Sequence, residues 1–230
     1  IAREVAPEIP VHISTQANVT NLSAVEFWHS LGAERVILAR EVTGDELKYI
    51  CANTKCEVEV FVHGAMCISM SGRCLISNYM TGRDANAGDC AQSCRWNYAL
   101  MEENRDGQYF PVEQDERGTY FYNSKDLCLL EHVEEIARMG VKSLKIEGRM
   151  KSIMYVSTVT GVYRQAIDQA VKDDYKVKDE WWKYLTSVSH REYTEAFYNG
   201  QADDTSMNYG TSSYVRGCDF LTVVEGDHED

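Results

Sequence analysis

Eight cysteines are spread over the 230-residue chain, and four of them fall in one short segment. Cys67, Cys74, Cys90 and Cys94 follow one another at intervals of seven, sixteen and four residues. None of these intervals has the two-residue gap of a zinc knuckle, so a zinc ribbon fits poorly. Thiolates scattered along a folded, glycine-rich loop suit a [4Fe–4S] cluster. The segment therefore predicts an iron–sulfur site with these four cysteines as its metal ligands.

Several features of this segment sharpen the prediction and leave alternatives open. Gly64, Gly72 and Gly88 let the backbone pass close to a bulky inorganic core. We expect the four sulfurs to lie within about 7 Å of one another. Zinc, or four buried cysteines without a ligand, are the alternatives, since cysteine is among the most buried residue types. Cys128 is the rival fourth ligand, although it is expected at the start of a helix; the remaining cysteines are interpreted as structural: Cys51, Cys56 and Cys218.

Composition restricts the class of protein. Hydrophobic residues make up 44% and charged residues 26%, which is ordinary for a globular protein. No apolar run is long enough to cross a bilayer and no signal peptide is present, so we expect a cytoplasmic protein with no membrane partner. The net charge of −13 means that a nucleic-acid partner would need local basic patches. The first residue is Ile1 and the last residues are acidic, which predicts a fragment of a longer protein.

The elements that must position these cysteines alternate between strands and helices. Apolar runs predict strands at 11–14, 36–39, 58–62 and 144–146. Helical spacing predicts a helix over 21–31, and Thr43 with Glu46 forms a capping box for a second helix. This alternation is typical of parallel β/α units, so the expected fold class is α/β with a parallel sheet. The cysteine segment (residues 67–95) interrupts the alternation and is expected to be irregular.

Polar residues follow the predicted strands closely. In parallel β/α architectures, functional groups gather at the carboxyl ends of the strands. Because these ends share one face, the residues should ring one cavity, with the cysteine segment as its wall. They are Gln16, Arg40, Glu41, His63, Glu147 and Arg149.

One stretch resembles a family signature. It is Glu59-x-Phe61-x-x-Gly64-Ala65-Met66-Cys67, then four residues, then Gly72-x-Cys74-x-Ile76-Ser77. The chain is thereby identified as a member of the collagenase-like peptidase family U32. Ser124-x-Asp126-Leu127-Cys128 and the run from Lys145 to Ser152 also match. Cys90-x-x-x-Cys94-Arg95-Trp96 is similar to the family's tRNA-hydroxylating subgroup.

The resemblance implies a fold and an activity. It implies a TIM-barrel-like core, here partial because its first part is missing. It also implies oxygen-independent RNA hydroxylation with prephenate as the hydroxyl donor and the wobble uridine of tRNA as the target, giving 5-hydroxyuridine. The implied cofactor is a [4Fe–4S] cluster, and the implied partners are tRNA and a second subunit of the same family.

Roles for individual residues follow under this interpretation. Carboxylates of the donor would be bound by cations, because arginine recognises carboxylates with two hydrogen bonds. Glu147 or His63 would move protons as catalytic residues. Trp96 and Tyr98 could stack on the substrate base. The proposed substrate-binding residues are Gln16, Arg40, Glu41, Arg95, Arg149 and Lys151.

Two other functions remain open. A peptidase would need a cysteine nucleophile beside His63 or His132, but four clustered cysteines favour a metal cluster. A non-catalytic, cluster-bearing subunit of a hydroxylating complex is the third hypothesis. The expected regions are β/α units at 1–66, the cysteine-rich segment and a hairpin at 67–120, the last β/α units at 121–175, and a C-terminal extension at 176–230.

Overall fold

A mixed sheet organises the residues that the computed structural model describes, which are 2–96, 99–101, 109–111, 124–172, 175–200, 215 and 217–218. Its strand order is β1-β2-β3-β6-β8, and β7 also pairs with β3. The predicted stacking residue Tyr98 lies outside the described residues.

The four predicted strands are present and parallel. β1 (His12–Ile13) pairs with β2 (Arg35–Ile37), and β2 pairs with β3 (Glu57–Ala65). β7 (Ser143–Ile146) also runs parallel to β3, with a bulge in the register between Phe61 and His63. This confirms the prediction of parallel β/α units. The structure neither completes nor excludes a barrel.

Two short strands were missed by the sequence analysis. β6 (Asp126–Cys128) pairs antiparallel with the end of β3, and β8 (Tyr193–Thr194) pairs parallel with β6. The expectation that Cys128 begins a helix is therefore wrong, because Cys128 is the last residue of β6. A 3-10 turn at Leu130–His132 and α5 (Val133–Arg138) come after it. The sequence of β6 was interpreted as the start of that helix, and β8 does not lie in a run of apolar residues, which explains the omission.

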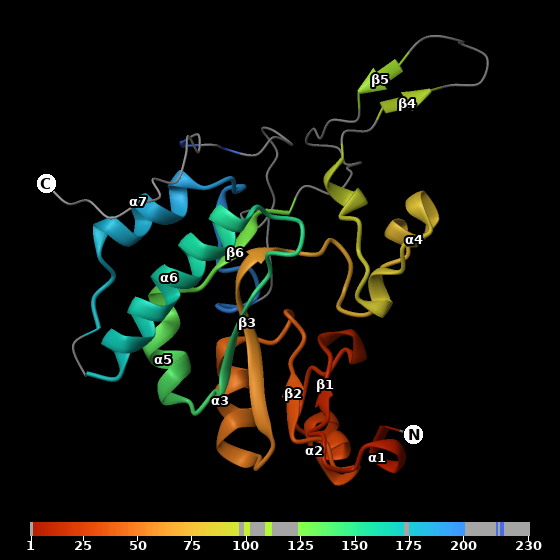
Figure 1. The fold of residues 1–230 in the computed structure, drawn as a ribbon, viewed down its shortest axis with the longest axis vertical. Helices are drawn as coiled ribbons and strands as arrows, with labels where there is room; N and C mark the ends of the chain where they lie inside the picture. The colour runs from red at the N-terminus through yellow and green to blue at the C-terminus, as the bar shows by residue number, and fades with distance from the viewer. Residues whose placement is uncertain are drawn as a thin grey trace, which may run out of the picture.

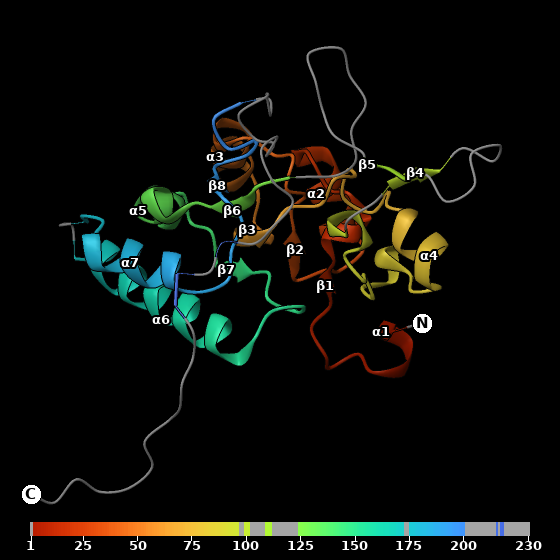
Figure 2. The same ribbon diagram turned by 90° about the horizontal axis from the view of Figure 1, so that it is seen from above.

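Helices lie in an arc along the strands, as Figure 2 shows from above. They are α2 (Leu22–Ser30), α3 (Gly44–Asn53), α5, α6 (Ile153–Ala170) and α7 (Asp179–Ser187). Thr43 caps α3 with the predicted capping box: its hydroxyl accepts from the Glu46 N–H, and the Glu46 carboxylate accepts from the Thr43 N–H. The core contains buried residues from each of these helices, among them Val25, Leu47, Ile50, Ile136, Val159 and Leu185.

The cysteine segment lies beyond the carboxyl ends of β1, β2 and β3, drawn in yellow in Figure 1. It contains a helix, α4 (Ile76–Thr81), and two 3-10 turns, Ala85–Ala87 and Ser93–Arg95. An entirely irregular segment was therefore an incorrect expectation. A hairpin of β4 (Ala99–Met101) and β5 (Tyr109–Pro111) follows it.

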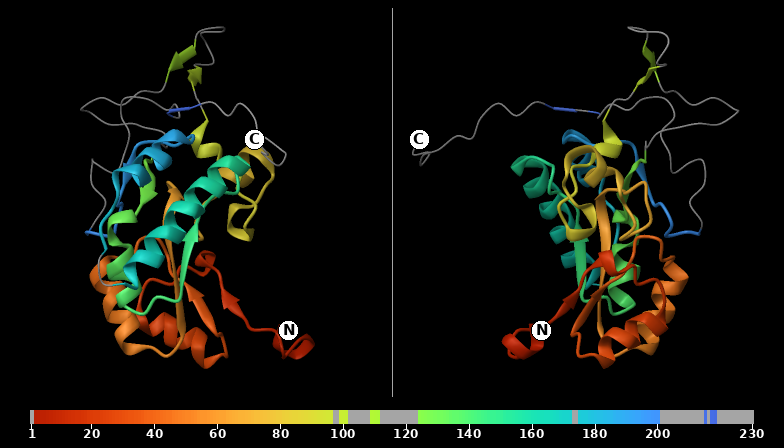
Figure 3. Two further views of the ribbon diagram at one scale, coloured as in Figure 1. Left: turned by 60° about the vertical axis from the view of Figure 1, so that its left-hand side comes forward. Right: turned by 90° about the vertical axis from the view of Figure 1, so that its right-hand side faces the viewer.

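The amino-terminal helix α1 (Ala2–Val5) stands apart from α4, at the other end of the strands in both views of Figure 3. Among the helices that the structure describes, none combines the length and the apolar character that a transmembrane span requires.

Candidate functional site

A cavity of about 260 Å³ lies between the strand ends and the cysteine segment. We call it the cysteine cavity. All four predicted ligand cysteines line it, from both sides of α4. Five of the predicted polar residues also line it, and they come from the ends of β1, β2 and β7 or from the cysteine segment itself. These lining residues are Cys67, Cys74, Cys90, Cys94, Gln16, Arg40, Arg95, Glu147 and Arg149.

Two glycines permit the close approach of backbones around this cavity. Gly64 has a φ of +109°, and a Cβ there would stand 2.3 Å from the carbonyl oxygen of Glu147. Gly72 has a φ of +76°, and its Cβ would stand 2.1 Å from the carbonyl oxygen of Gln16. A side chain at Gly64 would force the ends of β3 and β7 apart, and one at Gly72 would push the cysteine segment away from the end of β1.

Arg40 is the cation at the end of β2 in this cavity. Its guanidinium carbon lies 3.7 Å from the centroid of the Phe61 ring, and its Nη2 lies 4.0 Å from Oε2 of Glu147. Burial lowers the pKa of Arg40, and Glu147 opposes that shift. A guanidinium stacked on a ring keeps its edge available for a planar anion.

Arg149 lines the cavity and also contacts the cysteine segment. Its guanidinium donates to the backbone carbonyls of Gly88 and Cys90, and its backbone N–H donates to Oε1 of Glu147 at 3.0 Å. Arg149 therefore ties the strand end of β7 to the part of the segment that carries Cys90.

Glu41 lies outside the lining of the cavity. Its two carboxylate oxygens accept from the backbone N–H of Ser71 at 2.9 Å and from the Ser71 hydroxyl at 3.0 Å. Ser71 lies between Cys67 and Cys74 in sequence, so Glu41 anchors the loop that carries these two cysteines. This contact is a structural role that the sequence alone did not indicate.

His63 also lies outside the cavity, in what we call the aromatic cluster. Its ring centroid lies 5.4 Å from that of Tyr163, 5.1 Å from that of Tyr193 and 6.1 Å from that of Tyr155. Its Nδ1 is 3.3 Å from the Tyr163 hydroxyl, and Nε2 meets no hydrogen-bond partner in the described part of the chain. Burial lowers the pKa of His63 to about 3, so it is neutral at neutral pH.

Cys128 lies beside the aromatic cluster and does not line the cysteine cavity. Its sulfur is 3.8 Å from the Tyr163 hydroxyl, and burial raises its pKa to about 11. Cys128 and His63 are register partners in the antiparallel pairing of β6 with β3.

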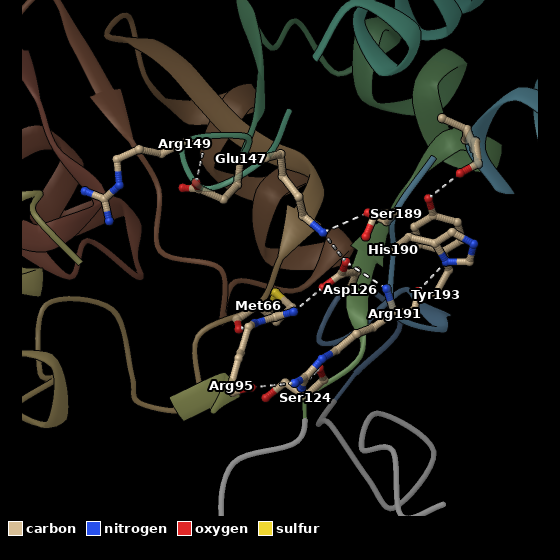
Figure 4. Close-up of polar contacts among 12 residues, drawn as sticks. Met66, Arg95, Ser124, Asp126, Glu147, Arg149, Ser189, His190, Arg191 and Tyr193 are labelled. Carbon is tan, nitrogen blue, oxygen red and sulfur yellow. Dashed lines mark hydrogen bonds and ion pairs between the residues drawn. The ribbon is translucent and has the colours of Figure 1, made fainter. Parts of the chain in front are cut away.

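Lys151 and Arg95 both contact Asp126, and Figure 4 shows Arg95 beside Asp126. The Lys151 ammonium lies 3.5 Å from Oδ2 of Asp126 and donates to the Ser189 carbonyl at 3.0 Å. Arg95 reaches the other oxygen, Oδ1, at 2.7 Å. Lys151 is thus a buried network residue outside the cavity lining, whereas Arg95 belongs both to the lining and to the network. Trp96, next in sequence, is 46% exposed.

The four cavity thiols influence one another electrostatically. Burial raises the pKa of Cys67 to about 11, and the neighbouring Cys74 and Cys94 act in the same direction. Burial also raises the pKa of Cys94, which Arg95 opposes. Such thiols are poor nucleophiles on their own, and a bound metal would be needed to hold them as thiolates.

The donor set suits a cluster better than a single ion. Within the described residues, no three Cys, His, Asp or Glu side chains come close enough together to bind one metal ion. In a [4Fe–4S] cluster each cysteine binds a different iron, so its ligands stand further apart than those of a zinc ion. Four cysteines line one cavity, and among the described residues that line it Glu147 is the only other side chain of the Cys, His, Asp or Glu type, which fits that requirement.

Some lining residues were not predicted from the sequence. Lys145 lies on β7 between two apolar residues, and its ammonium is 3.3 Å from Glu59 and 5.2 Å from the centroid of the Phe61 ring. The alternation of a strand places it on the face opposite to Leu144 and Ile146, and this signal could have identified it. Asp126 was noticed only as part of the family signature.

Comparison with known proteins assigns the chain to a family. The model of peptidase family U32 matches residues 1–208, so the chain belongs to this family, as the signature had predicted. No solved structure matches the chain.

Several relatives are named for RNA hydroxylation. The chain is 40% identical to tRNA hydroxylation protein P1 of Bacillus subtilis over 230 residues, which is 99% of this chain and 54% of that protein. It is 38% identical to tRNA hydroxylation protein P of Escherichia coli, over 91% of this chain and 55% of that protein. A 23S rRNA 5-hydroxycytidine synthase of Escherichia coli is 35% identical over 73% of this chain and 24% of its own length. The chain spans about half the length of the first two relatives.

Proposed function

We propose that this chain is the cluster-bearing part of an RNA hydroxylase. Relatives that match most of the chain are named tRNA hydroxylation proteins, and another is named as an rRNA hydroxycytidine synthase. The proposed reaction is the oxygen-independent formation of 5-hydroxyuridine at the wobble position of tRNA, with prephenate as the hydroxyl donor. The place of action is the cytoplasm, and a second subunit of the same family is a proposed partner.

The observation that carries this proposal is the cysteine cavity. Four thiols from one segment share it with Arg40 and Glu147, which come from two different strand ends. The thiols supply the ligands of a [4Fe–4S] cluster, and the strand ends supply polar groups for a substrate. A cluster held there would polarise the hydroxyl donor or exchange electrons with it.

The protein side chains would bind and orient the donor. Arg40, whose guanidinium is stacked on Phe61, would bind one carboxylate of prephenate. Lys145 and Gln16 line the same cavity and would contact the remaining polar groups. Glu147, which lies 4.0 Å from Arg40, would accept or return a proton. His63 is not part of this proposal, because it is buried on the aromatic side of β3.

A peptidase is less well supported than a hydroxylase. A cysteine peptidase needs a thiol of lowered pKa and a histidine beside it. Burial raises the pKa of Cys67 instead, and the described residues that line the cavity include no histidine.

Two measurements test the proposal. Protein purified without oxygen should be brown, with iron and sulfide in equal amounts, and colourless protein with no iron would contradict the cluster. Mass spectrometry of tRNA nucleosides from cells that lack the full-length gene should show a loss of 5-hydroxyuridine that the intact gene restores. Unchanged nucleosides together with an iron-loaded protein would favour a non-catalytic subunit or another substrate.

A further inference from the structure

Asp126 forms a buried hub between three parts of the chain. Its carboxylate is 0% exposed. Oδ1 contacts Nη1 of Arg95 at 2.7 Å, and Oδ2 contacts Nζ of Lys151 at 3.5 Å. Oδ2 also accepts a hydrogen bond from the backbone N–H of Arg191 at 3.1 Å. Asp126 is the first residue of β6, and Figure 4 shows it beside Arg95 and Arg191.

Arg95 connects Asp126 to the wall of the cysteine cavity. While Nη1 binds Asp126, Nη2 donates to the backbone carbonyl of Met66 at 3.1 Å. Met66 directly precedes Cys67, and Arg95 directly follows Cys94. One guanidinium therefore connects the two ends of the cysteine segment, and the carboxylate fixes its orientation.

We propose that Asp126 is a positioning residue that, through Arg95, holds Cys94 against Cys67 in the wall of the cysteine cavity. This inference deepens the proposed function, because it concerns the geometry of the ligand set. Asp126 itself does not line the cavity, so its effect on the thiols passes through Arg95. The role of Arg95 is then to fix the ligand set, and not to bind a carboxylate of the substrate.

The electrostatics of the hub agree with this role. Burial alone would raise the pKa of Asp126, but Arg95 and Lys151 more than offset burial and bring the pKa below its usual value. The carboxylate is therefore ionised at neutral pH. A charge-assisted contact between a carboxylate and a guanidinium fixes direction as well as distance, which an apolar contact would not do.

Thiol labelling of the metal-free, reduced protein tests the proposal. A brief exposure to iodoacetamide, followed by peptide mass spectrometry, measures the alkylation rate of each cysteine in the same molecule. Asp126→Asn should raise the rate at Cys94 roughly tenfold, because local opening of its turn becomes easier. The rate at Cys74 should change less than about twofold, because Asn86 holds the Cys74 backbone by two separate hydrogen bonds.

Matched variants separate positioning from general stability. Asp89→Asn removes an exposed ion pair with Arg83 from the same segment and should leave the labelling rates of Cys67, Cys74 and Cys94 unchanged. Arg95→Lys keeps a positive charge for Asp126 but loses the second arm that reaches Met66, so it should also raise labelling at Cys94. If Asp126→Asn does not fold, Arg95→Lys decides the question.

The outcomes are distinct from those that test the proposed function. Equal increases at Cys67, Cys74 and Cys94 would mean that Asp126 only stabilises the fold, and would overturn the inference. Unchanged labelling at Cys94 in both variants would also overturn it. The labelling assay contains no metal. A wild-type protein that binds no iron would therefore refute the cluster, but the labelling rates would still test the role of Asp126.

Discussion

The two sides of β3 near its carboxyl end both carry cysteine and ionisable side chains, and they differ in what surrounds these groups. On one side, Cys67 and Cys74 line the cysteine cavity with Arg40 and Glu147. On the other side, His63 and Cys128 pack into the aromatic cluster. The same residue types thus face a substrate-sized space on one side and a filled core on the other. Whether a cysteine or an ionisable residue here can meet a ligand therefore depends on which side of β3 it lies, and not on its residue type.

The largest expected difference between the two sides concerns iron. Cys74 and Cys128 are each 5% exposed, so they are matched in burial. Cys74→Ser should abolish iron binding and hydroxylation, because one ligand of the cluster is lost. Cys128→Ser should keep its iron. Iron and sulfide analysis of anaerobically purified variants makes the comparison; loss of iron from Cys128→Ser with retention in Cys94→Ser would exchange the roles of these two cysteines.

The cavity side should also respond to the removal of a cation. Arg40→Ala should raise the concentration of prephenate needed for half-maximal hydroxylation by roughly ten- to a hundredfold, since a hydrogen bond to a charged group contributes about 1.5–3 kcal/mol. Its iron content should stay at the wild-type level. Steady-state kinetics with varied donor measures the effect, and an unchanged requirement for donor would exclude Arg40 from the donor site.

On the aromatic side, burial of His63 should make the free energy of unfolding depend on pH. His63 has a folded-state pKa lowered to about 3, so the unfolded chain binds its proton more readily. Its contribution to stability is complete above the unfolded pKa and is lost as pH falls toward the folded value. Between about pH 7 and about pH 5, His63→Phe should lose roughly 2 kcal/mol less stability than the wild type.

Urea unfolding at the two pH values measures this effect. Variants of the cavity side, such as Arg40→Ala, serve as the control and should show the wild-type pH dependence. An identical acid response in the wild type and His63→Phe would mean that His63 is not held neutral by the core.

The smallest expected effect concerns the exposed link across the cavity. Arg149 donates to the carbonyls of Gly88 and Cys90, and contacts of this kind contribute about 1 kcal/mol. Arg149→Ala should therefore lose iron several times faster than the wild type when challenged with a chelator, while its requirement for prephenate changes little. The opposite pattern, stable iron with a raised requirement for donor, would place Arg149 at the substrate.

Much of the fold was accessible from the sequence, because its signals are local. The parallel strands β1, β2, β3 and β7 follow from apolar runs, and the cap of α3 follows from Thr43 and Glu46. β6 and β8 were missed, because β6 was interpreted as the start of a helix, β8 lies in no apolar run, and their pairing depends on distant partners.

The candidate site divides in the same way. The spacing of the cysteines indicated which side chains to consider, and the four thiols share one cavity. The sequence did not reveal that Glu41 binds Ser71 or that Arg95 binds Asp126, because these partners lie 30 and 31 residues away. From the sequence, His63 was also expected at the cavity. The cavity is lined by Phe61 but not by His63, and the bulge in β3 between these two residues has no sequence signature.

The pairing of β3 with β7 has a consequence for how the protein is made. His63 and Ile146 are register partners although about eighty residues separate them along the chain, so the sheet closes only after a long loop has been brought together. The cysteine segment lies inside that loop. Its thiols therefore emerge from synthesis well before Glu147 and Arg149 exist to form the rest of the cavity wall. We expect the nascent chain to depend on a reducing compartment, and refolding in air to trap disulfides among the four cysteines.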